Sequence, residues 1–440
     1  MEEESSIFEN IRVIMLKFLS LFLGIVLSFN SFSQWQWTQM ANMPIRTANN
    51  AVTEHLSVTG QSFLYSFGGI DSTKIYSGIH NRVFEYNVLL NSWSEKQSIP
   101  DTLGKIAMGA SNVYGKIYLM GGYHVLPNGN EISSNRVHIF NPNLGTFEAD
   151  GAPIPVPIDD HVQCVYKDSL IFLVTGWSQN TNKVDVQIYD PSLDQWQAGT
   201  SVPNSGLYKV FGASGYIIGD TLYYLGGATT GTNFPAQSTL RKGFINPNDP
   251  TDITWSTMPS APAGASYRSA CSGNVNEVFW VGGSSVSYNY NGIAYNGTGG
   301  VPPRNRILHL SSIGNQYQNF DSQPYGVMDL RGIGKFNNGR WMICGGMDSN
   351  QVVSNRTFLL ENTTLSSIQK NLEEEISIKY LASGIQIDLL KPKHLKLISI
   401  EGKTVLEQMN SNALFIDNQQ FSKGTYFLQT EKSSRKIIIQ

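Results

Sequence analysis

Six positions in the chain carry a cationic or potentially cationic side chain before a glycine-containing turn. They are Arg46, Lys105, His161, Lys209, Arg268 and Arg331. Each precedes the second residue of the next turn by 15 to 23 residues. Arginine can hold a carboxylate through two parallel hydrogen bonds, and several cations around one opening focus a positive potential on an anion. The pattern predicts a site for an anionic ligand, with packing and turn hydrogen bonds as the alternative role.

Three tyrosines form a second candidate site. Tyr288, Tyr290 and Tyr295 lie in the longest segment that follows a glycine pair, residues 284–305. Long irregular loops on a rigid scaffold are where binding usually occurs. Exposed tyrosines beside asparagines can stack on a sugar and hydrogen-bond to it. A tyrosine-rich cover without a ligand is equally compatible with the sequence.

Catalytic motifs are not found in the sequence. It has no GxSxG, HExxH, P-loop or EF-hand pattern. Asp159, Asp160 and His161 form the densest acid and base cluster, but adjacent residues of a strand point to opposite faces, which argues against a shared metal site. The three cysteines are far apart and lie in apolar strand patterns, as expected of packing residues. We therefore predict no catalytic residue, no metal and no cofactor.

The composition favours many short strands joined by turns. Charged residues make up 15% of the 440 residues, while glycine (41), tyrosine (20) and phenylalanine (21) are abundant. The formal net charge of −3 gives no general attraction to nucleic acid or to anionic membranes. We therefore predict no nucleic-acid partner, and charge-based recognition has to be local.

A repeat positions the candidate residues. Six apolar strands end in a glycine turn, at Gly68-Gly69, Gly121-Gly122, Thr175-Gly176, Gly226-Gly227, Gly282-Gly283 and Gly345-Gly346. Successive turns are 53, 54, 51, 56 and 63 residues apart. Each unit has four apolar segments, and an aromatic residue near its end precedes a proline by seven or eight residues. A period of this length predicts an array of four-stranded units.

The order of a double glycine, a tyrosine-bearing strand and a tryptophan resembles the kelch repeat, over roughly Trp35 to Glu361. The resemblance implies an all-β fold, a six-bladed propeller with one four-stranded blade per unit and the first strand innermost. The six cationic residues would then ring the mouth of the central channel. The sixth unit lacks a tryptophan strand after residues 355–360, whereas residues 35–38 supply one without a unit. We therefore expect the N-terminal strand to complete the sixth blade.

The period stops beyond Glu361, and a separate set of short strands follows a polar stretch. They are Ile385–Leu390, Leu395–Ile400, Thr404–Gln408, Leu414–Ile416, Tyr426–Thr430 and Lys436–Ile439, and they predict a small antiparallel β-sandwich. Residues 398–405, 421–428 and 435–439 resemble the type A C-terminal sorting domain of Bacteroidetes type IX secretion. The Pro-Asn-Pro usual near the start of that domain is replaced by residues 380–384. The resemblance implies the type IX secretion machinery as a partner.

The N-terminal residues indicate export. Lys17 is followed by the apolar run 18–29 and by Ser31-Phe32-Ser33-Gln34, as in a secretory signal peptide, and the run is short for a membrane span. We predict a signal peptide over residues 1–33, with Met15 as the true start. The remaining segments are a propeller over 34–361, a linker over 362–376 and a sorting domain over 377–440. The mature protein would have no transmembrane span and would be secreted or at the cell surface.

The sequence thus predicts an exported, non-catalytic kelch propeller that binds a glycan or a protein. An enzyme is the alternative, because kelch propellers of this size include the sialic acid mutarotases, which act on an anionic sugar. The basic ring would suit that substrate, with an arginine holding the carboxylate and an acid or base such as His161 serving ring opening. That alternative depends on analogy of fold.

Overall fold

The computed structural model describes residues 35–362, except 58, 59, 263 and 338, together with 376–381, 384–399, 402–429 and 434–439. The predicted signal peptide and nearly all of the predicted linker lie outside these residues. Strands dominate the described part of the chain, whose helices are two single 3₁₀ turns, Tyr76–Gly78 and Ser349–Gln351. None of the helices described there is long and apolar enough to cross a membrane.

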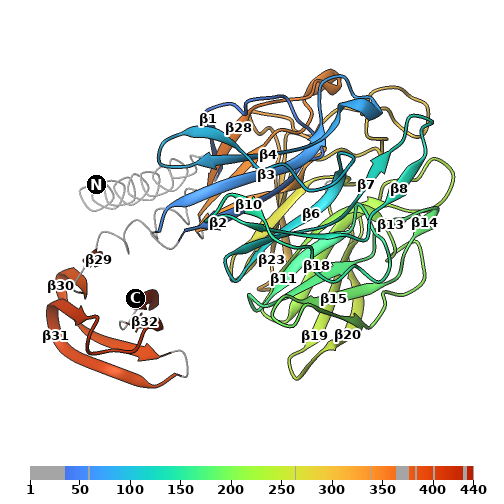
Figure 1. Ribbon diagram of the computed structural model, residues 1–440. Helices are drawn as coiled ribbons and strands as arrows, with labels where there is room; N and C mark the ends of the chain where they lie inside the picture. The colour runs from blue at the N-terminus through green and yellow to red at the C-terminus, as the bar shows by residue number, and fades with distance from the viewer. Residues whose placement is uncertain are drawn as a thin grey trace, which may run out of the picture.

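The first three blades of the propeller are antiparallel sheets that follow one another along the chain (Figure 1). Blade 1 consists of β2 (Ala51–Leu56), β3 (Ser62–Ile70), β4 (Ile79–Asn87) and β5 (Ser92–Lys96). Blade 2 consists of β6 (Ile106–Val113), β7 (Lys116–Val125), β9 (Val137–Asn141) and β10 (Thr146–Phe147), with β8 (Glu131–Ser133) paired to β7. Blade 3 consists of β11 (Val162–Tyr166), β12 (Leu170–Val174), β15 (Val186–Asp190) and β16 (Gln195–Gly199). A separate hairpin leaves blade 3, made of β13 (Trp177–Ser178) and β14 (Thr181–Asn182).

The other three blades repeat this arrangement. Blade 4 consists of β17 (Phe211–Ile218), β18 (Thr221–Ala228), β19 (Leu240–Asn246) and β20 (Asp249–Met258). Blade 5 consists of β21 (Ala270–Gly273), β22 (Glu277–Val281), β23 (Ile307–Ser311) and β24 (Gln316–Phe320). Blade 6 consists of β26 (Gly334–Asn337), β27 (Arg340–Cys344), β28 (Thr357–Asn362) and the N-terminal β1 (Trp35–Met40). The short β25 (Arg331–Gly332) runs parallel to β2. The inner strands contact one another in cyclic order, which makes a six-bladed ring.

The ring closes as the sequence predicts. β1 pairs antiparallel with β28 over six residues, from Trp35 opposite Asn362 to Met40 opposite Thr357 (Figure 1). The ring of Trp35 is 3% exposed and packs 4.8 Å from Phe279 of blade 5, measured between ring centroids. The two ends of the repeat array are therefore joined by main-chain hydrogen bonds and by a shared core.

The glycine turns connect each blade to the next. In all six blades the N–H of the second residue of the turn donates to a carbonyl that precedes the first strand of the following blade. These bonds are Gly69 to Lys105, Gly122 to Ile158, Gly176 to Val210, Gly227 to Ser266, Gly283 to Val327 and Gly346 to Thr47. A Cβ on Gly226 would lie 2.0 Å from the oxygen of Ser266, so no side chain fits at this approach. The sixth bond returns from blade 6 to blade 1.

The tryptophans of the fourth strands pack between neighbouring blades, as their spacing predicts. Trp93 Nε1 donates to the carbonyl of Ala41 at 2.9 Å, and Trp196 Nε1 donates to that of Ala152 at 2.8 Å. Each ring thereby satisfies its N–H while its apolar face stays in the core.

The C-terminal domain has fewer and longer strands than the sequence suggests. Its strands are β29 (Ile376–Leu381), β30 (Gly384–Ser399), β31 (Thr404–Asp417), β32 (Gly424–Gln429) and β33 (Ser434–Ile439). Two predicted pairs of strands are therefore single strands, β30 and β31, which pair with each other through register shifts and curve strongly (Figure 1). Side chains from both halves of β30 share one core, including Ile387 and Leu397. A curved pair of long strands thus builds the β-sandwich.

Candidate functional site

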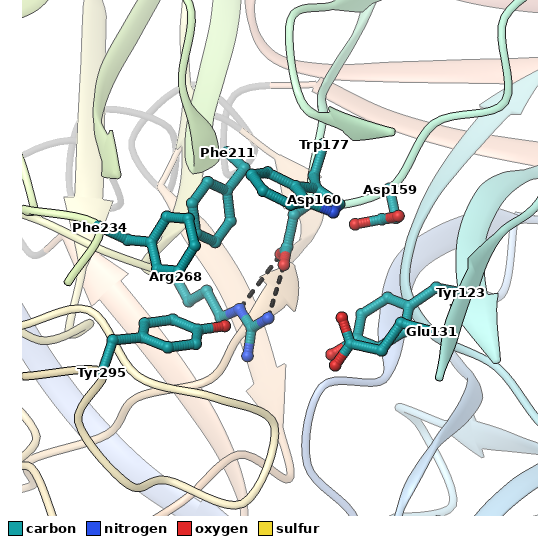
Figure 2. A pocket seen from close by; sticks show the side chains of 9 residues that line it. All are labelled: Tyr123, Glu131, Asp159, Asp160, Trp177, Phe211, Phe234, Arg268 and Tyr295. Atoms are coloured by element: carbon teal, nitrogen blue, oxygen red, sulfur yellow. Dashed lines mark hydrogen bonds and ion pairs between the residues drawn. The ribbon is translucent and has the colours of Figure 1, made fainter. Parts of the chain in front are cut away.

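A cavity of about 120 Å³ lies among segments of blades 2 to 5 (Figure 2). Its lining residues are Tyr123, Glu131, Asp159, Asp160, Trp177, Phe211, Phe234, Arg268 and Tyr295. They occupy repeated positions of the fold: directly after a glycine turn, just before or at the start of a first strand, or in the segment between the second and third strands. The propeller repeat therefore brings residues more than 170 positions apart to one place.

One side of the cavity is a wall of aromatic rings. Phe234 lies edge-on to Trp177 at 5.5 Å, to Phe211 at 5.7 Å and to Tyr295 at 4.9 Å, measured between ring centroids. Tyr123 lies across the opening from Phe234 and Tyr295 (Figure 2). Edge-to-face packing is a favoured arrangement that fixes each ring through its neighbours. The wall therefore offers a rigid apolar surface against which a ligand can stack.

Arg268 joins the cavity to the buried centre of the propeller. Its Nη2 and Nε contact the two carboxylate oxygens of Asp160 at 2.5 and 3.2 Å, and its Nη1 contacts Asp329 Oδ1 at 3.0 Å. All three side chains are almost fully buried. The guanidinium also lies over the rings of Tyr267 and Tyr288, at 5.2 and 5.5 Å. Two carboxylates thus balance this one cation, which leaves little positive potential for a ligand.

Two further carboxyl groups of the cavity are not ion-paired with any described basic residue. Asp159 is 3% exposed, and its Oδ2 accepts a hydrogen bond from Ser133 Oγ at 2.5 Å. Burial raises the pKa of Asp159 well above its ordinary value, and the neighbouring charge of Asp160 adds to this effect. Glu131 lies at the exposed rim on β8, and partial desolvation also raises its pKa.

Three of the six predicted cationic residues meet around Asp160. Arg331 Nη1 lies 3.6 Å from Asp160 Oδ1, and its Nη2 donates to the carbonyl of His161 at 2.8 Å. Arg331 and His161 line a second cavity of about 70 Å³ between the inner strands, and Arg268 lines the first. The arginines here face a carboxylate of the protein itself.

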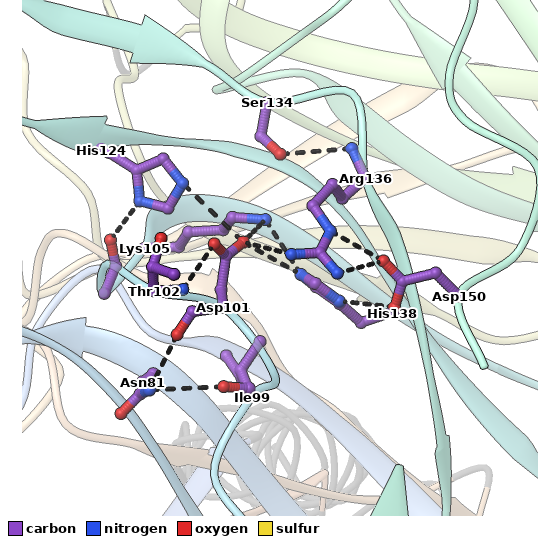
Figure 3. Close-up of polar contacts among 11 residues, drawn as sticks. Asn81, Ile99, Asp101, Thr102, Lys105, His124, Ser134, Arg136, His138 and Asp150 are labelled. Carbon is purple, nitrogen blue, oxygen red and sulfur yellow. Dashed lines mark hydrogen bonds and ion pairs between the residues drawn. The ribbon is translucent and has the colours of Figure 1, made fainter. Parts of the chain in front are cut away.

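The other three cationic residues line neither cavity. Arg46 is exposed and donates to the carbonyl of Val353, and Lys209 is half-buried beside blade 4. Lys105 is 1% exposed and lies in a polar cluster between blades 1 and 2, where Asp101, His138, Arg136 and Asp150 also gather (Figure 3). Its Nζ lies 2.8 Å from Asp101 Oδ2 and 3.0 Å from His138 Nε2. Lys105 therefore holds the crossing between two blades together.

The three loop tyrosines have different environments. Tyr288 is fully buried, and its ring lies 5.1 Å from that of Tyr267, so the expectation that it is exposed is wrong. Tyr290 is half-buried and packs against the apolar cluster that contains Tyr267 and Tyr288. Tyr295 alone of the three lines the cavity. The loop folds over the core because its apolar rings gain more from burial than from contact with water.

The sequence analysis did not identify most of the aromatic wall. Tyr123 and Trp177 stand directly after the glycine turns of blades 2 and 3, where the other blades carry Ile70, Ala228, Ser284 and Met347. A large aromatic side chain at this repeated position is the feature of the sequence that could have identified Tyr123 and Trp177 as cavity residues. In the described part of the chain, no group of three or more His, Cys, Asp or Glu side chains is placed to hold a metal ion.

His161 provides a pH-dependent test of the buried centre. Burial and the nearby Arg331 lower its pKa to about 4. The folded-state pKa of His161 lies below the unfolded value near 6.5. The neutral imidazole therefore contributes fully to stability above pH 6.5, and this contribution is lost as the pH falls to 4. Between pH 6.5 and pH 4 the free energy of unfolding of the wild type should therefore fall by about 3 kcal/mol more than that of the His161→Gln variant, which has no titrating group at this position. Urea unfolding of both proteins at pH 7, 5.5 and 4 measures the difference. An equal fall in the free energy of unfolding of the wild type and the variant would contradict the lowered pKa of His161.

Comparisons with known proteins address each part of the chain. Residues 381–440 match the family described as the secretion system C-terminal sorting domain. Beta-scruin of Limulus polyphemus is 26% identical over 176 residues, which are 39% of this chain and 18% of that protein. The kelch repeat and BTB domain-containing protein 1 of camelpox virus (strain CMS) is 26% identical over 95 residues, which are 22% of this chain and 16% of that protein. The chain thus spans less than a fifth of the length of these relatives.

A solved structure, titled "Structure of YjhT", shares the fold. The TM-score is 0.58 at 13% identity, and the match covers 79% of this chain and 99% of the other. The sorting-domain match confirms the secretion machinery as a partner and a secreted or cell-surface location. The kelch relatives and the shared fold agree with the six blades described above. The chain is therefore a six-bladed kelch-repeat β-propeller that ends in a C-terminal sorting domain for secretion.

Proposed function

We propose that this exported propeller binds a carbohydrate in the cavity of blades 2 to 5 and does not transform it. The observation that carries the proposal is an aromatic wall facing carboxyl groups that form no ion pair with a basic residue of the described chain. Aromatic rings stack against the C–H face of a sugar, and carboxylates accept hydrogen bonds from its hydroxyl groups.

The size of the cavity favours one sugar residue over a longer chain or a protein surface. A volume of about 120 Å³ holds roughly four water molecules at 30 Å³ each. Pockets for drug-sized ligands measure about 300–1,000 Å³, and stable protein interfaces bury about 1,200 Å² or more. We therefore propose that the cavity takes part of a terminal sugar, while the rest of the glycan stays in water.

The charges at the site favour this proposal over the mutarotase alternative. An acidic sugar needs a cation that is free to hold its carboxylate. Arg268 is engaged by Asp160 and Asp329, and Arg331 is also directed at Asp160. The cavity therefore suits a ligand that brings no negative charge.

Truncating the aromatic wall should weaken sugar binding. A glycan array first identifies glycans that bind the wild type. We expect Trp177→Ala to lower the affinity for these glycans by about 10-fold or more, because a stacking ring contributes roughly 1.5–3 kcal/mol through burial. Trp177 is half-buried, so the variant should keep the fold. Isothermal titration calorimetry measures the affinity, and the melting temperature checks the fold.

Phe244→Ala is the matched control, since Phe244 is 52% exposed on β19 and does not line the cavity. This variant should bind like the wild type. Equal affinity of the Trp177→Ala variant and the wild type would contradict the site. Faster anomerisation of N-acetylneuraminate in an NMR assay would contradict the non-catalytic proposal.

A further inference from the structure

We infer that the cavity selects a sugar with a free amine, in its ammonium form, over the same sugar with a hydroxyl group. The inference rests on the proposed carbohydrate binding and names the ligand class. It depends on three features of the cavity: its excess of carboxyl groups over cations, the position of these groups and the aromatic rings around them.

Carboxyl groups outnumber cations among the residues that line the cavity. Glu131, Asp159 and Asp160 line it with a single cation, Arg268. Asp160 and Asp329 already form ion pairs with that guanidinium, and the nearby Arg331 is also directed at Asp160. Within the described chain, no cation is therefore left for Glu131 and Asp159. A ligand that brings a positive charge would supply a cation for these carboxyl groups.

The two unpaired carboxyl groups lie on the same side of the opening. Figure 2 shows Asp159 and Glu131 directed toward the space in front of the Arg268 side chain, with Tyr123 beside them. Ser133 fixes Oδ2 of Asp159, whereas Oδ1 receives no hydrogen bond from a described residue. An ammonium group donates three hydrogen bonds, while a hydroxyl group donates one, so the ammonium group offers more donors to these carboxyl oxygens.

The aromatic rings add a second attraction for a cation. A ring face carries negative electrostatic potential, and a cation within about 6 Å of the ring centroid is attracted by it. Tyr123, Trp177 and Tyr295 border the space in which the carboxyl groups converge (Figure 2). Rings and carboxylates together are the arrangement that recognises ammonium ligands, and they distinguish an amine from a neutral hydroxyl group.

Proton release gives the inference a specific signature. In the empty cavity, burial raises the pKa of Asp159 and of Glu131, and the charge of Asp160 adds to both effects. The charged groups that act on Asp159 are Asp160, Glu131 and Arg268. A bound ammonium favours the ionised carboxylates, so protons leave as the ligand enters. A ligand without charge would release none.

The test compares D-glucosamine with D-glucose, which differ at one substituent, on the full chain at pH 6.5. We expect calorimetry to give an affinity about 10-fold or more higher for glucosamine, since hydrogen bonds to charged partners are roughly twice as strong as neutral ones. Titrations in two buffers of different ionisation enthalpy should show proton release with glucosamine only. Added salt should weaken the preference.

Two variants test whether the preference for glucosamine over glucose arises in the cavity. Glu131 is exposed, so the isosteric Glu131→Gln keeps the fold and should reduce the glucosamine preference several-fold. Asp168→Asn is the control, because Asp168 is exposed in the turn between β11 and β12, at the end of β11 remote from Asp160. It should leave the preference unchanged.

The outcomes separate the two proposals. Equal affinity for both sugars would overturn the ammonium inference while leaving carbohydrate binding supported. A preference that Glu131→Gln does not reduce would also overturn it. Absence of binding to every sugar would overturn the proposed function. In that case, saturable binding of methylammonium to the wild type but not to the Glu131→Gln variant would still support an ammonium site in the cavity.

Discussion

Deletion of β1, residues 35–40, is expected to destabilise the propeller by about 5 kcal/mol or more, which corresponds to a fall in melting temperature of roughly 10 °C. The deletion removes six paired residues from blade 6 and exposes the edge of β28. It also removes Trp35, whose ring packs against Phe279 and Trp341. Truncating a buried tryptophan alone costs about 3–5 kcal/mol.

Two controls test whether closure is the cause. Gln36→Ala combined with Gln39→Ala changes only exposed side chains of the same strand and should alter stability by less than about 1 kcal/mol. A synthetic peptide of residues 35–43 should bind the deleted protein and restore its melting temperature, as in strand addition to an open sheet edge. An unchanged melting curve after deletion would contradict closure by β1.

Replacement of Arg268 by methionine is expected to cost about 3–5 kcal/mol at pH 8, because it leaves Asp329 buried without its ion-pair partner and Asp160 with only the more distant Arg331. Burial already raises the pKa of Asp329 to about 6, and the charge of Arg268 opposes this rise. Removal of the guanidinium should raise it further. A carboxyl group with a raised folded-state pKa stabilises the fold at low pH and loses that contribution as the pH rises, so the variant should be closest to the wild type near pH 4 to 5.

Urea unfolding followed by tryptophan fluorescence measures this effect in the propeller, because all eight tryptophans lie before residue 342. Arg340→Met is the matched control, since Arg340 forms a partly exposed pair with Glu361 on blade 6. Such pairs contribute about 0–1 kcal/mol. A cost for Arg268→Met as small as that of the control, or one that grows toward acidic pH, would contradict the role of Arg268 as the counter-charge.

The repeat and its closure could be read from the sequence because both depend on local patterns. Each glycine turn needs backbone without a side chain where the next blade approaches, and each fourth strand needs a large ring between sheets. These requirements recur in every blade, so their spacing alone gave six units and located β1 in the last one. The sorting domain was recognisable for the same reason, although the strongly curved β30 and β31 were each divided in the prediction.

The cationic positions show where a repeated pattern is insufficient. Arg268 and Lys105 occupy similar places in their units, yet Arg268 lines the cavity and Lys105 holds a blade crossing. The sequence gives the sign of a side chain but not its partner. Asp160 and Asp329, which engage Arg268, lie 108 and 61 residues from it. Their proximity follows from the ring and not from spacing along the chain.

The sequence by itself determined the all-β class, the six blades, the N-terminal strand that completes the last blade and the secretion domain. Only the tertiary structure decided that Arg268 and Arg331 face buried carboxylates and that aromatic rings and carboxyl groups line the cavity. The physical reason is that strands and turns are set by neighbouring residues, whereas the electrostatic potential of a cavity is the sum over side chains contributed by several blades.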